Sequence, residues 1–107
     1  MPAFNRGEVW LTDLGLAAKV RPCLVLSNPP VPPHRSLVTL VPHTTSLRGT
    51  RFEIAVPKAF LKTGAFDAQG LVTVAPPRLL RKLGTLQDAE MQSVEEGVKQ
   101  WLGLSAS

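Results

Sequence analysis

The sequence has one cysteine, Cys23, among its 107 residues, and one thiol allows neither an internal disulfide nor a cysteine-rich metal site. Cys23 lies inside the apolar run 23–26, so we interpret it as a small core residue. No apolar stretch is long enough to cross a bilayer, and the first residues lack the pattern of a signal peptide. We therefore expect a cytoplasmic protein that does not enter the membrane.

The patterns that mark common cofactor enzymes are also absent. The chain has two histidines, His34 and His43, and they form no metal-binding pattern with Cys23. It has no acidic pair at catalytic spacing and no glycine-rich phosphate loop. These absences disfavour a metal enzyme or a nucleotide-dependent enzyme, and we expect neither a metal nor a cofactor.

Acidic residues are few over most of the chain. The formal net charge is +4, and eleven of the twelve Lys and Arg residues precede Gln87, whereas four of the eight acids follow it. A basic body with an acidic C-terminal segment fits an anionic ligand such as nucleic acid. Basic residues also aid solubility, and charge alone does not separate the two interpretations.

Ten prolines and eight glycines interrupt the chain, which favours short strands over long helices. The length fits one domain covering residues 1–107. Apolar runs predict strands at 7–14, 21–27, 36–41, 52–56 and 70–75, a helical turn at 58–61 and a short element at 79–83. Met91, Val94, Val98 and Trp101 fall on one helical face, which predicts a helix over 88–102. The expected fold is mainly β (α+β), a small SH3-like curved sheet or barrel of about five to seven strands with a C-terminal helix.

A polar cluster follows the apolar run 37–41. It consists of His43, Thr44, Thr45 and Ser46, with Arg48 just beyond, and hydroxyls beside a guanidinium suit a phosphate. Neighbouring side chains alternate in an extended strand, so either Thr44 and Ser46 or His43 and Thr45 share a face. The cluster is a candidate binding site at the end of a strand.

Arg21 is the other candidate. It follows Lys19 and opens the apolar strand at 21–27, a costly place for a permanent charge unless the guanidinium reaches the rim or a partner. An arginine and hydroxyl donors are sufficient to stabilise charge in metal-free RNA cleavage, because the attacking 2′-hydroxyl belongs to the substrate. A histidine near its ordinary pKa is one way to move the proton.

Several segments resemble the MazF/PemK (Kid-like) toxins of type II toxin-antitoxin systems, in the order found in that family. They are 6–14 (RGEVWLTDL), 20–27 (VRPCLVLS), 41–46 (VPHTTS), 82–86 (KLGTL) and 101–104 (WLGL). The resemblance implies a barrel of the CcdB/MazF type and a homodimer. It also implies a metal-independent, sequence-specific endoribonuclease that cleaves single-stranded RNA and is inhibited by a cognate antitoxin.

By resemblance, Arg21 takes the place of the family's catalytic arginine, and Thr44 that of its catalytic or phosphate-binding threonine. The remaining candidates are expected to contact RNA, and they are Lys19, His43, Thr45, Ser46, Arg48 and Arg78. One family arginine is matched either by Arg78 or by Arg81, and the resemblance does not decide between them.

Two departures from the family pattern keep an alternative open. In the PemK branch an arginine and an aspartate of a later strand act as acid and base, and those places hold Thr73 and Ala75 here. The loop before Arg21, at 15–19, is shorter and lacks the family's polar groups. The alternative is a non-cleaving relative that acts by binding, either as a gyrase poison like CcdB or as a barrel that binds nucleic acid or antitoxin.

Overall fold

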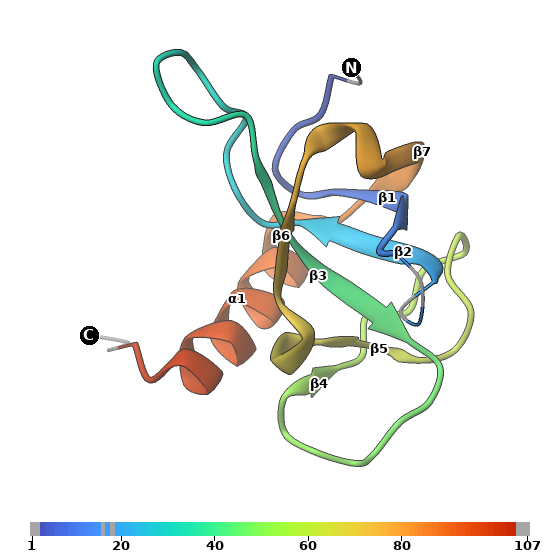
Figure 1. Ribbon diagram of the computed structural model, residues 1–107. Coiled ribbons are helices and arrows are strands. Elements are labelled where there is room, and N and C mark those ends of the chain that lie inside the picture. The colour runs from blue at the N-terminus through green and yellow to red at the C-terminus, as the bar shows by residue number, and fades with distance from the viewer. Residues whose placement is uncertain (1–2, 16, 18, 105–107) are drawn as a thin grey trace.

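The computed structural model describes residues 3–15, 17 and 19–104. Seven strands and one α-helix follow one another along the chain (Figure 1). The strands are β1 (Glu8–Asp13), β2 (Val20–Val25), β3 (Val38–Thr44), β4 (Glu53–Ile54), β5 (Ala65–Asp67), β6 (Val72–Val74) and β7 (Leu79–Thr85), and the helix is α1 (Asp88–Leu102). Two short 3₁₀ helices flank β6, η1 (Ala68–Gly70) before it and η2 (Pro76–Arg78) after it.

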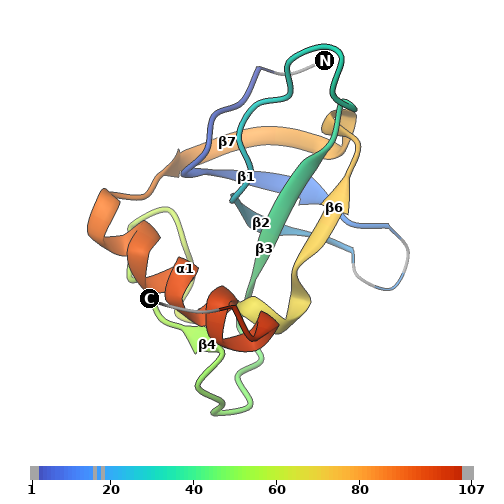
Figure 2. The ribbon, with the colours of Figure 1, turned by 90° about the vertical axis from the view of Figure 1, so that its left-hand side faces the viewer.

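The strands form one antiparallel, strongly bent sheet in the order β4-β5-β3-β2-β1-β7, with β6 also paired to β3. No pairing among the described residues joins β4 to β7, so the sheet does not close on itself. The mainly β fold with a C-terminal helix is confirmed. Figure 2, turned by 90°, shows α1 along one side of the sheet beside β4.

The central strands are buried on both faces, which explains why they read as nearly continuous apolar runs. Val9, Leu24 and Val41 face the cluster that contains the buried residues of α1. Their neighbours Trp10, Cys23 and Leu40 face a second cluster on the other side of the sheet. Cys23 is fully buried there, and burial raises the pKa of its thiol to about 11, as expected of a core residue.

Helix α1 has the predicted bounds. The Glu90 carboxylate accepts a hydrogen bond from the Gln87 backbone N–H at 2.8 Å, which stabilises the first turn. Gly103 adopts a left-handed conformation (φ 71°), which ends the helix. Within the described residues, no helix is both long and apolar enough to cross a membrane.

The middle of the chain differs from the sequence-based prediction in three places. Residues 58–61 form a hydrogen-bonded turn instead of a helical turn, with the Leu61 N–H donating to the Lys58 carbonyl at 3.0 Å. Strand β5 was not predicted, because three residues are too few to show an alternating pattern. Strand β3 also extends to Thr44, beyond the predicted end at residue 41, and therefore includes His43 and Thr44.

Candidate functional site

Pairing between β3 and β5 divides the polar cluster between two faces. Thr44 pairs with Ala65 and His43 pairs with Phe66. Because side chains two residues apart share a face, Thr44 and Asp67 lie on the same side of the sheet. His43 points to the opposite side, where its ring contacts Phe66 edge-on at a centroid distance of 5.1 Å.

The segment just before β5 passes so close to β3 that residue 64 must be a glycine. A Cβ atom at Gly64 would lie 2.2 Å from the Thr44 carbonyl oxygen and 2.8 Å from His43 Cε1. The His43 side chain is packed in by these neighbours, and His43 is only 4% exposed. Burial lowers the pKa of the His43 imidazole from its ordinary 6.5, so the ring is neutral at pH 7.

Strand β2 brings Arg21 beside Thr44. Cys23 pairs with Pro42 in the antiparallel ladder, and extending this register by two residues places Arg21 across from Thr44. Both residues line the same pocket of about 540 Å³ and a neighbouring pocket of about 500 Å³. Two candidates that are more than twenty residues apart in sequence therefore lie on neighbouring strands beside the same two pockets.

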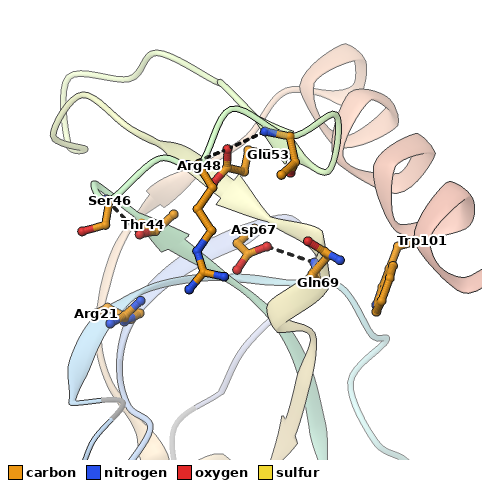
Figure 3. A pocket seen from close by; sticks show the side chains of 9 residues that line it. Arg21, Thr44, Ser46, Arg48, Glu53, Asp67, Gln69 and Trp101 are labelled. Carbon is orange, nitrogen blue, oxygen red and sulfur yellow. Dashed lines mark hydrogen bonds between the residues drawn. The ribbon is translucent and has the colours of Figure 1, made fainter.

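The first pocket, which we call the Arg21 pocket, combines positive charge with hydroxyls and carboxylates (Figure 3). It is lined by Arg21, Thr44, Ser46, Arg48, Thr50, Glu53, Asp67, Gln69 and Trp101. In Figure 3 Arg48 extends from its loop toward Arg21 and Asp67, and Trp101 stands at the far side, beyond Gln69. Arginines, hydroxyls and an open mouth suit a phosphodiester.

The loop that carries Arg48 is organised by the carboxylate of Glu53. This carboxylate accepts hydrogen bonds from the backbone N–H groups of Arg48, Gly49 and Thr50, the shortest at 2.7 Å from Gly49. The bond from the Arg48 N–H makes the largest contribution to lowering the Glu53 pKa below its ordinary 4.5. Glu53 is therefore a structural anion that holds Arg48 over the pocket.

We expect the loop to respond to the charge of Glu53. A lowered pKa means that the three hydrogen bonds are fully present above pH 4.5 and are lost as the pH falls through the lower value in the folded protein. The amide resonances of Arg48, Gly49 and Thr50 should titrate together in NMR spectra with a midpoint below 4.5. In Glu53→Gln the shared titration should vanish, and its persistence would assign it to another group.

Asp67 is the pocket carboxylate that still has an oxygen available to accept a hydrogen bond or a proton. Its Oδ1 accepts from the Gln69 backbone N–H at 3.1 Å, which caps η1. Among the described residues, Oδ2 has no hydrogen-bond donor. Sequence reasoning missed Asp67, because it looked for a carboxylate at the position of Ala75 and β5 gave no signal of its own.

The remaining candidates lie around the pocket at different distances. Ser46 lines the pocket, and its N–H donates to Thr44 Oγ1 at 3.0 Å. Thr45 and His43 line the neighbouring pocket, which Lys19 also reaches. Arg78 does not join them, since its guanidinium lies 3.6 Å from the Asp13 carboxylate in a separate depression with Lys19.

The two positions to which the resemblance assigned the acid and base, Thr73 and Ala75, are not part of the Arg21 pocket. The Thr73 hydroxyl on β6 is hydrogen-bonded to that of Thr39 at 2.8 Å. Neither Thr73 nor Ala75 lines the pocket. Asp67, on β5, lines this pocket together with Arg21 and Thr44.

The fold has close counterparts among solved structures. An endoribonuclease from a mycobacterial species, solved in complex with its cognate antitoxin, is 28% identical over 98% of this chain and 100% of its own, with a TM-score of 0.82. The Mycobacterium tuberculosis toxin MazF-mt6 is 27% identical over 92% of this chain and 98% of its own, with a TM-score of 0.76. MazF from Deinococcus radiodurans, 23% identical over 97% of this chain and 100% of its own, shares the fold with a TM-score of 0.79.

A comparison of the sequence with models of protein families identifies the same group of toxins. Residues 5–102 match the model described as PemK-like, MazF-like toxin of type II toxin-antitoxin system. The match contains Arg21, Thr44 and all the other residues of the Arg21 pocket. The resemblance seen in the sequence is confirmed, and the chain belongs to the family of PemK-like, MazF-like toxins of type II toxin-antitoxin systems.

Proposed function

We propose that the protein is the toxin of a type II toxin-antitoxin system and a metal-independent, sequence-specific endoribonuclease. It cleaves single-stranded RNA in the cytoplasm, acts as a homodimer and is inhibited by a cognate antitoxin. The observation that carries this proposal is that Arg21 on β2 and Thr44 on the neighbouring strand β3 line one pocket with Arg48 and Asp67. The mycobacterial endoribonuclease with its antitoxin supports the activity and the partner.

Arg21 and Thr44 hold the scissile phosphate in this proposal. The guanidinium donates to non-bridging oxygens and stabilises the charge that grows on the phosphorane. Thr44 Oγ1 already accepts a hydrogen bond from the Ser46 N–H, so its own proton points elsewhere and is free for a phosphate oxygen. Arg48 adds a second positive group at the pocket.

Asp67 accepts the proton of the attacking 2′-hydroxyl. Its Oδ2 has no donor among the described residues, whereas Glu53 is already occupied by three backbone N–H groups. The 2′-oxygen bonds to phosphorus, the bond from phosphorus to the 5′-oxygen breaks, and that oxygen takes a proton from water. The products are a 2′,3′-cyclic phosphate and a free 5′-hydroxyl, and no metal is required because the nucleophile comes from the substrate.

The non-cleaving alternative is not favoured. Its sequence support was the loss of a carboxylate at Ala75, and Asp67 supplies a carboxylate from β5. A second support was the shortened loop at 15–19, of which residues 16 and 18 lie outside the described part of the chain. Of its described residues none lines the Arg21 pocket, and Lys19 lines the neighbouring one. Neither departure removes the groups that the proposed reaction needs.

The proposed activity is tested on a long single-stranded transcript in the presence of a chelator. We expect cleavage at a limited set of sites and products that end in a 2′,3′-cyclic phosphate. A short RNA that contains one such site should resist cleavage when the nucleotide before the scissile bond is 2′-deoxy. Intact transcript, or equal cleavage of the 2′-deoxy substrate, would overturn the proposal, and growth arrest with intact RNA and trapped gyrase complexes would favour the alternative.

A further inference from the structure

Trp101 is a large apolar residue on the predicted apolar face of the helix, but it is not buried. It follows Val94 and Val98 along the apolar face of α1, and both of these valines are in the core. Trp101 itself is 43% exposed, and its indole lines the Arg21 pocket. An exposed indole beside arginines and hydroxyls is unusual for a packing residue and needs another explanation.

The indole is held from one side. Phe52 contacts it edge-on, at a centroid distance of 5.4 Å and an interplanar angle of 64°. The Arg51 guanidinium covers the Phe52 ring at 5.0 Å from its centroid. This row of three side chains orients the indole and leaves part of its surface open to the pocket, which suits stacking of a planar group.

Gln69 stands between Trp101 and the reacting groups (Figure 3). Its backbone is fixed in η1 by the hydrogen bond to Asp67, but its exposed side-chain amide has no hydrogen bond among the described residues. An amide offers a donor and an acceptor in one plane, which matches the edge of a nucleobase. One end of the pocket is thus suited to phosphate and the other to a base.

We propose that Trp101 and Gln69 form a nucleobase subsite of the Arg21 pocket. The subsite takes one unpaired base of single-stranded RNA, which stacks on the indole while the Gln69 amide bonds to its edge. This inference rests on the proposed function, because it needs RNA to enter the pocket. It assigns part of the sequence preference to a residue at the end of α1, which the sequence placed on the apolar face of the predicted helix.

The test measures binding separately from cleavage. A short single-stranded RNA of random sequence, with fluorine in place of each 2′-hydroxyl, binds without reacting. We expect Trp101→Ala to weaken binding by about 5- to 140-fold, the range for loss of one base–aromatic stack. Trp101→Phe keeps a ring and should retain most of the affinity. Leu102→Ala is the matched control, since Leu102 is 48% exposed on the same helix end but does not line the pocket.

Fluorescence gives a direct readout of stacking. The other tryptophan, Trp10, is 9% exposed and donates to Glu8 at 3.0 Å, so quenching by RNA reports on Trp101. We expect quenching in the parent and in Leu102→Ala, and none in Trp101→Phe. The affinity of each protein is also measured for RNA pools enriched in one base. For Gln69→Ala, we expect these affinities to differ less from pool to pool than they do for the parent.

Two results would overturn the subsite. One is RNA binding by the parent without quenching, together with equal affinity of Trp101→Ala. The other is a change of oligomeric state in Trp101→Ala, measured by light scattering, that accounts for its whole loss of affinity. In both cases the RNA is still bound, so the proposed function stands. Absence of RNA binding by the parent would instead count against the proposed function itself.

Discussion

Arg21→Ala is expected to lower the rate of RNA cleavage by about 10²- to 10³-fold, which corresponds to about 2.7–4 kcal/mol of transition-state stabilisation. This is the typical effect of removing one donor from a developing anion. Arg21, on β2, lines the same pocket as Thr44, on β3, and its charge faces the phosphate in the proposed reaction. The measurement is single-turnover cleavage of an RNA that contains one site.

Two further variants separate a local effect from a general loss of charge. Arg21→Lys keeps the charge but loses the planar pair of donors, so it should recover only part of the rate. Arg35→Ala removes one positive charge from the exposed loop before β3, at the opposite end of that strand from Thr44. It should leave the rate unchanged. Equal rates for Arg21→Ala and the parent would show that the charge is stabilised by another group.

The helix and the long strands were predictable because their signals are local. Apolar side chains at helical spacing defined α1 with its observed bounds. The runs that gave β1 and β2 reflect burial on both faces of the bent sheet. Strand β5 and the true end of β3 depend on pairing between distant segments, and this pairing leaves no periodic pattern in three residues.

The contrast between local signals and pairing of distant segments also explains how much of the site could be predicted. Arg21 and Thr44 were named from motifs, but their proximity follows from the pairing of β2 with β3, which sequence spacing does not give. Asp67 and Trp101 enter the pocket from β5 and α1, elements whose positions depend on the whole fold. His43 was a candidate of the same cluster as Thr44, and alternation along β3 turns it away from Thr44.

Asp67→Asn is expected to lower the cleavage rate by about 10²- to 10⁴-fold, the usual contribution of a general base. The substitution keeps the shape of the side chain and an oxygen that accepts from the Gln69 N–H, so η1 should remain capped. It removes the negative oxygen that takes the 2′-proton. Asp88→Asn is a matched control, because Asp88 is an exposed aspartate at the start of α1 outside the pocket.

Chemical rescue distinguishes proton transfer from a structural role for Asp67. In Asp67→Ala the missing carboxylate leaves space that added formate or acetate can fill, and we expect these anions to restore part of the rate. Neither anion should help Asp67→Asn, in which the amide occupies that space. His43 is the competing base, since its lowered pKa leaves the ring neutral and able to accept a proton at pH 7. A large loss of rate in His43→Gln with a normal rate in Asp67→Asn would transfer the role to His43.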